Sequence, residues 1–169
     1  MLDEIRLRNE APDDLDAIRR LNEAAFPTPA EGRLVDLLRE AGRLTLSIVA
    51  VAGDQIVGHV ALSPITVDGS VAGLGLAPLA VDAAYRRQGI GGALIEHSLD
   101  RCRELRTPLV VVLGEPAYYR RFGFESASRY GLVDEYGGGD AFQALWLGPT
   151  APRPSGTIKY APEFSIFGV

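Results

Sequence analysis

The stretch Leu79-Ala80-Val81-Asp82-Ala83-Ala84-Tyr85-Arg86-Arg87-Gln88-Gly89-Ile90-Gly91-Gly92 carries the chain from an apolar strand, through a glycine-rich turn, into a helix. The first amides of a helix have no partner within it and carry the positive end of the helix dipole. Glycines at 89, 91 and 92 let a ligand approach this backbone, and Arg86 and Arg87 add positive charge. The turn therefore suits a diphosphate, although its spacing alone fits an ordinary glycine-rich helix start equally well.

Two other phosphate-binding loops do not fit this turn. A P-loop needs Gly-Lys followed by Ser or Thr, and the turn contains no lysine. The dinucleotide-binding fingerprint needs a third glycine at the position that Leu94 occupies. Neither nucleotide triphosphate nor dinucleotide binding is therefore expected here.

The rest of the chain predicts a mixed sheet flanked by helices. Proline and acidic residues near Pro12 indicate a helix start, and Gly53-Asp54 indicates a hairpin turn. Pro78 cannot donate to a strand ladder, so we expect a bulge or an edge there. The element order predicts an α/β fold (an α+β mixed sheet) and no regular doubly wound repeat. Expected strands are 4–8, 44–52, 55–63, 74–81, 109–113, 126–133 and 141–147, expected helices begin near 12, 30, 89 and 116, and the tail from Pro149 is expected to be loop.

Three of these elements carry explicit expectations of burial. The second helix, 30–40, places Leu34, Val35, Leu37 and Leu38 on its buried stripe, and the strand 109–113 is expected to be buried on both faces. The buried face of the helix 89–105 is expected to hold Leu94, Ile95, Leu99, Cys102 and Leu105.

Composition limits the classes of function. The 169 residues fit one domain, 1–169, and the net charge of −5 with scattered basic residues makes nucleic acid an unexpected partner. No apolar stretch approaches the roughly 18 residues that span a bilayer, and the first residues show no secretory signal. Cys102 is the single cysteine, which excludes an intrachain disulfide and a cysteine-rich metal site. A cytoplasmic protein without a bound metal is expected.

The turn and a second segment together resemble a known family. The residues from Leu79 to Leu94 are similar to the acetyl-CoA-binding motif Arg/Gln-x-x-Gly-x-Gly/Ala of the GNAT N-acetyltransferase superfamily, matched by Arg86, Gly89 and Gly91. Downstream, Ala117-Tyr118-Tyr119-Arg120-Arg121-Phe122-Gly123-Phe124 is similar to its Phe-Tyr-x-x-x-Gly-Phe segment. The resemblance covers nearly the whole chain, is most specific over 74–125, and is strongest to the bacterial YhbS-like branch.

The resemblance implies a splayed, twisted sheet and a role for each matched residue. It implies that Leu79, Ala80 and Val81 pair with the pantetheine arm of acetyl-CoA and that their amides polarise the thioester carbonyl. It places the pyrophosphate on the amides of Arg87, Gln88, Gly89, Ile90, Gly91 and Gly92, and it makes Arg86 a further cofactor-binding residue. Tyr119 would also contact the cofactor and act as the general acid, because a phenol can return a proton to the leaving thiolate. Tyr118 is the neighbouring alternative.

The general base is not fixed by the resemblance. An ammonium must lose a proton before it attacks, so a base is expected, and His59 and Glu115 are the candidates. A half-buried strand histidine with a satisfied hydrogen bond explains His59 as well, and a helix-start role explains Glu115 as well. Glu31 fits a cap, and His97 fits the surface. Cys102 falls on a buried stripe, so direct transfer without an acyl-enzyme is favoured.

The sequence therefore predicts transfer of an acetyl group from acetyl-CoA to a primary amine. The acceptor, a small molecule or a peptide, would enter beside the first two helices, the third strand and the C-terminal loops. A CoA-binding regulatory or interaction module without catalysis is the alternative, and O-acetylation or a longer acyl donor is a further one. A homodimer is compatible with the sequence.

Overall fold

The protein is described here by a computed structural model, in which residues 4–148 and 153–167 are placed. Over these residues nine strands form one mixed sheet, with the order β1-β2-β3-β4-β5-β8-β6 and with β9 joining β7 to the far end of β3. Neighbouring strands are antiparallel except for β4 with β5 and β7 with β9. The strands are β1 (Ile5–Asn9), β2 (Leu46–Ala52), β3 (Gln55–Val67), β4 (Ser70–Val81), β5 (Leu109–Leu113), β6 (Glu125–Ser126), β7 (Leu132–Asp134), β8 (Phe142–Trp146) and β9 (Gly156–Lys159).

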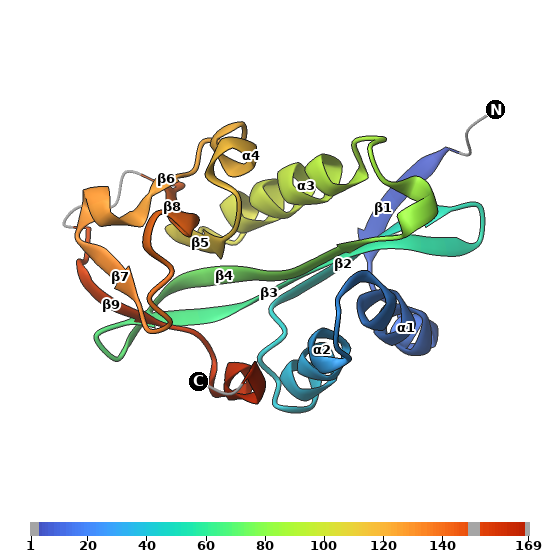
Figure 1. Cartoon of the computed structure of the whole chain (residues 1–169), viewed down its shortest axis with the longest axis horizontal. Coiled ribbons are helices and arrows are strands. Elements are labelled where there is room, and N and C mark those ends of the chain that lie inside the picture. The colour runs from blue at the N-terminus through green and yellow to red at the C-terminus, as the bar shows by residue number, and fades with distance from the viewer. Residues whose placement is uncertain (1–3, 149–152, 168–169) are drawn as a thin grey trace.

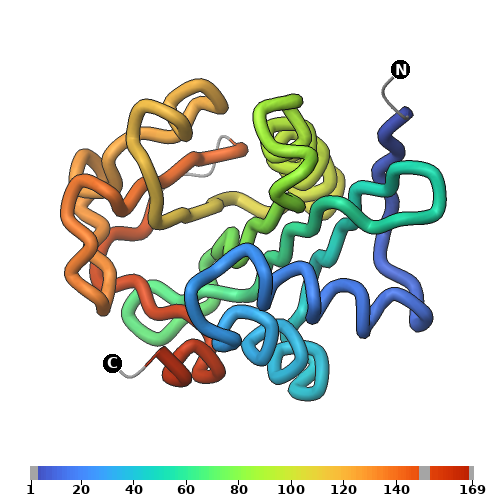
Figure 2. The backbone as a smooth tube through the Cα atoms, turned by 45° about the vertical axis from the view of Figure 1, so that its right-hand side comes forward, coloured from blue at the N-terminus to red at the C-terminus, as the bar shows by residue number. Residues whose placement is uncertain are grey.

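Helices cover both faces of the sheet (Figure 1). Helices α3 and α4 lie on one face, and helices α1 and α2 lie on the other with the C-terminal 3-10 helix η5 beside α2. Figure 2 shows the same two helical layers from another side. We call these the α3–α4 face and the α1–α2 face. The helices are α1 (Leu15–Ala25), α2 (Ala30–Glu40), α3 (Ile90–Glu104), α4 (Pro116–Arg120) and η5 (Pro162–Phe167).

Alternation along the strands divides the core between these faces. On β3, the even-numbered residues from Gly58 face α3, since a Cβ on Gly58 would meet Ile90 and Leu94 at 3.0 Å. The intervening residues, such as His59, face α1, where Asn22 contacts the imidazole. Two large apolar clusters result, one beneath α3 and one beneath α2 and η5. Burial of this apolar surface is the main stabilising term of the fold.

The predicted mixed sheet is confirmed, and so is the hairpin at Gly53-Asp54, which joins β2 to β3. The expected irregularity at Pro78 is also present, because the β3–β4 register shifts between the pairs Val60↔Leu79 and Leu62↔Leu76. Strands β3 and β4 are longer than predicted. Their hairpin turns at Asp68-Gly69, with φ values of 46° and 87°.

Several sequence predictions were wrong at the C-terminal end. The single strand expected over 126–133 is instead the short strand β6, a 3-10 turn and β7, because Gly131 (φ 71°) ends the turn and redirects the chain. The tail expected as loop contains β9 and η5, since β9 finds partners in both β7 and β3. Residues 149–152 lie outside the described ranges.

Three residues that were predicted to be buried are more exposed than expected, two of them on helices and one at the end of a strand. Leu105 is 52% exposed because α3 ends at Glu104 and Arg106 turns the chain with φ 58°. Leu37 is only partly buried on α2. The strand expected to be buried on both faces is buried from Leu109 to Val112, but Leu113, the last residue of β5, is 40% exposed.

Candidate active site

The start of helix α3 is an open anion site. Gly89 is the N-cap residue with φ 81°, it provides no side-chain cap, and the first turn holds no acidic residue. Arg87 also has a positive φ, 64°, so the backbone reverses sharply just before the helix. The first backbone hydrogen bond of α3 runs from the amide of Ala93 to the carbonyl of Gly89, at 3.0 Å. The amides of Ile90, Gly91 and Gly92 therefore have no partner from the helix itself.

These amides border a groove of about 630 Å³, which we call the turn groove. One wall is formed by the turn, and the other by Tyr118 of α4 together with Arg121 and Phe122, which directly follow α4. The turn residues on the groove are Val81, Arg86, Arg87, Gly89, Ile90, Gly91 and Gly92. The guanidinium of Arg121 lies 5.4 Å from the centre of the Tyr118 ring and 5.6 Å from that of Phe122. Three arginines against the single carboxylate of Glu96 give the groove a net positive charge.

The three glycines of the turn have different roles. A Cβ on Gly89 would meet nothing within 4 Å, so this position opens toward the groove. A Cβ on Gly91 would lie 3.1 Å from the Tyr118 hydroxyl, and one on Gly92 would lie 3.4 Å from the Phe122 ring. Gly91 and Gly92 thus also let α4 pack closely on α3, a structural role beyond the one predicted.

Strands β4 and β5 part directly beside this turn. They pair only at Leu74↔Val110 and Gly75↔Val111, although β4 continues to Val81 and β5 to Leu113. On its other side β4 stays paired with β3, through Val81↔Gly58, Ala80↔His59 and Leu79↔Val60. Within the described residues, the edge of β4 that faces β5 has no strand partner beyond Gly75. The predicted residues Leu79, Ala80 and Val81 lie on that edge, and it ends at the turn groove.

Tyr119 and Tyr118 occupy different environments on α4. Tyr118 is partly buried and lines the turn groove, whereas Tyr119 is 8% exposed and packs its ring over Gly114 and edge-on against Phe124. Burial raises the pKa of Tyr119 to about 12, with a smaller contribution from Tyr118. The Tyr119 hydroxyl therefore keeps its proton at neutral pH and can only donate it.

His59 does not line the turn groove but lies in the interior on the α1–α2 face. The side chain is 0% exposed, with Nδ1 3.2 Å from the Asn22 amide nitrogen and Nε2 2.9 Å from the Ser47 hydroxyl. The pKa of His59 is lowered to about 4, mainly by burial, while the charge of Glu10 partly opposes this shift and that of Arg39 adds to it. The imidazole is therefore neutral at pH 7 with both nitrogens engaged.

Glu115 lies on the α3–α4 face, at the start of α4. It precedes α4 and its backbone carbonyl accepts from the amides of Tyr118 and Tyr119, both at 3.1 Å. Its exposed side chain makes no capping hydrogen bond. The helix-start role thus belongs to the backbone, and the carboxylate is available to solvent.

The remaining candidates have structural environments. Cys102 is buried on α3, and burial raises the pKa of its thiol to about 11, which disfavours the thiolate that a nucleophile requires. His97 is half-buried on α3 and Glu31 lies in the first turn of α2. Among residues 4–148 and 153–167, no three His, Cys, Asp or Glu side chains form a group that could hold a metal ion.

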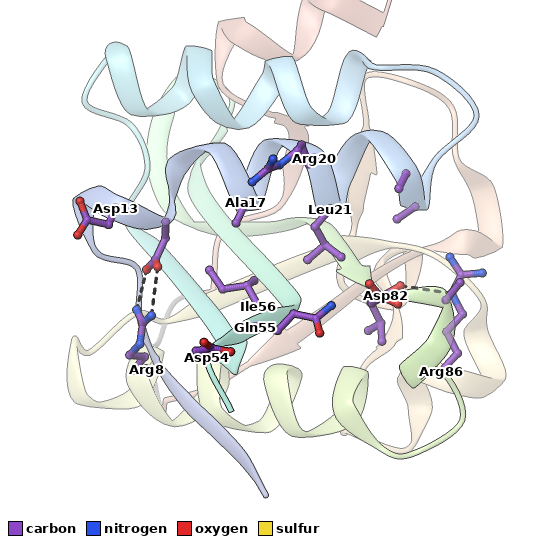
Figure 3. Close-up of a pocket in the computed structure, with 15 residues that line it drawn as sticks. Arg8, Asp13, Ala17, Arg20, Leu21, Asp54, Gln55, Ile56, Asp82 and Arg86 are labelled. Carbon is purple, nitrogen blue, oxygen red and sulfur yellow. Dashed lines mark hydrogen bonds and ion pairs between the residues drawn. The ribbon is translucent and has the colours of Figure 1, made fainter. Parts of the chain in front are cut away.

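A second cavity lies across β4 from the turn groove (Figure 3). This α1 pocket, of about 620 Å³, is bordered by Leu21, Ala24 and Ala25 of α1 and shares Val81 and Arg86 with the turn groove. Arg8 and Asp14 form an ion pair at its far end, with 2.6 Å between Nη1 and Oδ2. The last residues of β4 therefore separate two surface cavities, one on each face of the sheet.

Sequence reasoning missed two sets of residues. Arg121 and Phe122 of the turn groove fall inside the quoted Tyr119 segment, so the motif carried a signal for them that was not used. The partners of His59, namely Asn22, Ser47 and Glu10, come from three separate elements and no pattern in the sequence connects them.

Comparison with known proteins agrees with this geometry. The model of the acetyltransferase (GNAT) domain family matches residues 6–127. The chain is 41% identical over 165 residues to the uncharacterized N-acetyltransferase YhbS of Escherichia coli K12, covering 95% of this chain and 99% of that protein. It is 34% identical over 140 residues to the uncharacterized N-acetyltransferase YjhQ of the same organism, covering 79% and 77% of the two chains.

Two solved structures are similar over nearly the whole chain. A GNAT family N-acetyltransferase (YhbS) from Escherichia coli in complex with CoA has a TM-score of 0.93 and 40% identity, covering 100% of this chain and 96% of that one. A GNAT family acetyltransferase from Brucella melitensis in complex with acetyl-CoA has a TM-score of 0.82 and 38% identity, covering 96% and 99%. The chain therefore belongs to the GNAT acetyltransferase family and is an enzyme of the acyltransferase class.

Proposed function

We propose that the protein transfers the acetyl group of acetyl-CoA to a primary amine by direct attack of the amine on the thioester. The observation that carries this proposal is the unpaired edge of β4 that leads to the turn groove. An extended pantetheine arm can pair with such an edge as an added strand, and the diphosphate can bind the free amides at the start of α3. The CoA and acetyl-CoA in the two similar structures support the same ligand.

The turn residues fit that ligand. Gly89 leaves open space above the helix start, so phosphate oxygens can approach the amides of Ile90 to Gly92. Arg86, Arg87 and Arg121 supply charge on both walls of the groove. A diphosphate between a helix N-terminus and arginines gains hydrogen bonds to charged groups, which are roughly twice as strong as neutral ones. In the same way, amides near Leu79 to Val81 would polarise the thioester carbonyl.

Tyr119 is proposed as the general acid. Breaking the thioester leaves a thiolate that must take up a proton. Burial raises the pKa of Tyr119 to about 12, which keeps its hydroxyl protonated at neutral pH but makes it a weaker acid than a free tyrosine, so the shift supports its protonation state and not its strength as a donor. Its ring is fixed by Gly114 and Phe124, so the hydroxyl has a defined position. Cys102 is buried with a raised pKa near the C-terminal end of α3, whereas the turn groove lies at the N-terminal end, which supports direct attack without an acyl-enzyme.

An amine acceptor must lose a proton before it attacks the thioester, so the site also needs a general base. Glu115 is the favoured base, because its carboxylate is exposed and makes no capping hydrogen bond, and it lies four residues before Tyr119.

The acceptor is expected to be cationic, because the net charge of the chain is −5. Within the described residues no helix is long and apolar enough to cross a membrane. A cytoplasmic location, a homodimer and a small-molecule or peptide acceptor stay predictions from the sequence.

The test is an assay of free thiol released from acetyl-CoA by the purified protein with a panel of amines. We expect release that depends on the amine, with an acetylated amine identified by mass spectrometry. Propionyl- and succinyl-CoA, run in parallel, would reveal a different acyl preference. Tight CoA binding without thiol release from any amine would overturn catalysis and favour a CoA-binding regulatory module.

A further inference from the structure

A buried chain of hydrogen bonds crosses the α1–α2 face and has His59 at its centre. It begins at Asn22 on α1, whose amide nitrogen lies 3.0 Å from the Ile18 carbonyl and 3.2 Å from His59 Nδ1. It continues from His59 Nε2 to the Ser47 hydroxyl on β2 at 2.9 Å, and from Ser47 to the carboxylate of Glu10. Asn22 and His59 are 0% exposed and Ser47 is 8% exposed.

The direction of each hydrogen bond follows from its neighbours. The Ile18 carbonyl can only accept, so the atom of Asn22 that faces it is the amide nitrogen, which also donates to His59 Nδ1. Nδ1 must then be unprotonated, and Nε2 carries the proton and donates to Ser47. Ser47 in turn donates to Glu10, which can only accept. One consistent arrangement results, with His59 neutral in its Nε2–H tautomer.

Glu10 anchors the outer end of this chain. Its two carboxylate oxygens accept from Arg39 of α2 at 2.8 and 2.9 Å. Both residues line a surface pocket of about 320 Å³ together with Ser47. The chain therefore ties α1, β2, β3 and α2 to one another, from the interior to the surface.

This chain has its inner end next to the strand edge proposed to hold the thioester. His59 is paired across the ladder with Ala80 on β4, and Leu79 to Val81 are the residues proposed to contact pantetheine. Helix α1 packs against both β3 and β4. Leu21, the neighbour of Asn22, lines the α1 pocket together with Val81 of β4. Asn22, which contacts the His59 ring, therefore lies on the helix that packs over β4.

We propose that His59 is a positioning residue: the hydrogen bonds of its neutral ring hold α1 over strands β3 and β4, and so set the geometry of the β4 edge during acyl transfer. The role differs from that of a general base, since both ring nitrogens are engaged and the ring does not reach a cavity. The effect on turnover rests on the proposed function. The tautomer of His59 and the hydrogen bond that links α1 to the sheet are independent of the proposed function.

Two substitutions separate positioning from base catalysis. His59→Gln offers a carbonyl acceptor and an N–H donor about as far apart as the ring nitrogens, but it cannot take up a proton. His59→Leu removes both hydrogen bonds of the ring, so Asn22 keeps only its bond to the Ile18 carbonyl and Ser47 only its bond to Glu10. His97→Gln, on α3, is the matched control, because it replaces the other histidine of the chain outside this hydrogen-bond chain.

We expect His59→Leu to lower kcat by about 10- to 100-fold, because small displacements of reacting groups cost that much. Its affinity for acetyl-CoA should stay within about twofold, since the turn groove lies on the other face. His59→Gln should keep at least about a third of wild-type kcat with an unchanged pH profile, and His97→Gln should match the wild type. Equal losses of about 100-fold in both His59 variants, with the acidic limb of the pH profile removed, would overturn positioning in favour of base catalysis. Full activity of His59→Leu would also overturn it.

A structural measurement tests the inference without any turnover. The ¹⁵N spectrum of the imidazoles should show one protonated and one unprotonated nitrogen for His59 throughout pH 5.5 to 8, with a signal for the Nε2 proton protected from exchange. A doubly protonated ring at pH 7, or the Nδ1–H tautomer, would overturn the chain of hydrogen bonds. If no amine were turned over while this spectrum appeared as expected, the proposed function would fail and the arrangement around His59 would stand.

A double-mutant cycle completes the test. Asn22→Leu and His59→Leu remove opposite ends of the same hydrogen bond, so their effects on the free energy of unfolding should be strongly non-additive, with the double variant no less stable than the worse single one. Additive effects would overturn the link between α1 and β3.

Discussion

The two faces of the sheet position chemistry in different ways. On the α3–α4 face, the turn groove and Tyr119 come from one continuous segment, 81–122, and the groups proposed to bind the ligand are backbone amides at a glycine-rich turn. On the α1–α2 face, the polar groups around His59 come from residues 10, 22, 39, 47 and 59, and every contact between them uses a side chain. In the proposed function, cofactor binding and the control of strand geometry therefore lie on opposite faces of the sheet.

The faces meet at the last residues of β4. Val81 and Arg86 border a cavity on each side, and Ala80 is paired with His59. Substitutions in the turn groove should therefore change ligand affinity first, whereas those around His59 on the α1–α2 face should change stability and the rate of transfer. The predictions below, in order of decreasing effect, test whether this separation holds.

The largest effect is expected for Gly89→Val on the α3–α4 face. A branched residue at φ 81° is strained, and its side chain would enter the space in front of the free amides. The strain lowers stability, and the loss of two charge-assisted hydrogen bonds, at about 2 kcal/mol each, weakens CoA binding by about 4 kcal/mol, or about 1000-fold in calorimetric titration.

Gly69→Val is the matched control for this change. Gly69 has φ 87° and open space around it, but it lies in the β3–β4 hairpin, away from the groove. It should lower stability and leave the affinity for CoA within about twofold. Equal affinity for CoA in Gly89→Val and the wild type would show that the turn does not bind CoA.

The next effect is a dependence of stability on pH that arises from the α1–α2 face. His59 has a pKa of about 4 in the folded protein and about 6.5 in the unfolded chain, mainly because of burial, with Glu10 opposing and Arg39 adding to the shift. Between these values the unfolded state binds more protons, so stability falls as pH decreases from 6.5 to 4. The loss from this group is roughly 3 kcal/mol.

Denaturant unfolding at pH 7 and pH 4.5 measures this effect. His59→Gln removes the titrating group, so its stability should fall less over the same interval. An identical pH dependence in the wild type and His59→Gln would contradict a buried neutral imidazole.

Tyr119→Phe should lower kcat by about 100-fold, the lower range for loss of a general acid, with affinity for acetyl-CoA within about twofold. Because the pKa of Tyr119 is about 12, its loss of a proton should produce no falling limb in the pH–rate profile between pH 7 and 10. Tyr118→Phe is the matched neighbour and should change kcat little. A larger loss in Tyr118→Phe than in Tyr119→Phe would reassign the general acid.

The smallest effect is expected for Arg121→Ala on the wall of the turn groove. Loss of one charged contact should weaken CoA binding by about 10-fold and reduce its salt dependence. Arg120→Ala is the control, since Arg120 lies on the same helix but borders a different cavity. Equal effects of the two variants would indicate general attraction by charge and no specific contact.

The same contrast explains how much could be predicted from the sequence. The turn groove on the α3–α4 face could be predicted because strand, turn and helix follow one another in sequence. Arg86, Gly89 and Gly91 line the groove in the structure, whereas the α4 tyrosine that lines it is Tyr118 and not Tyr119. The splay of β4 from β5 was implied by resemblance, and Pro78 marks an irregularity beside it. The base and acid assignments stay predictions.

The α1–α2 face could not be predicted in this way. No spacing rule joins Glu10, Ser47 and His59, because their contacts depend on the register of three strands and on the packing of α1. The C-terminal errors have a similar origin. Strand β9 has only four residues and is stabilised by pairing with β3 and β7, which are distant in sequence.

The central claim is that the turn groove binds the diphosphate of acetyl-CoA. Titration calorimetry with acetyl-CoA and with S-acetylpantetheine, which keeps the thioester and lacks the diphosphate and adenosine, tests it most directly. The wild type should bind acetyl-CoA about 1000-fold more tightly than S-acetylpantetheine, and Gly89→Val should bind the two with nearly equal affinity. Equal affinities for the two ligands in the wild type, or an undiminished preference for acetyl-CoA in Gly89→Val, would contradict the claim.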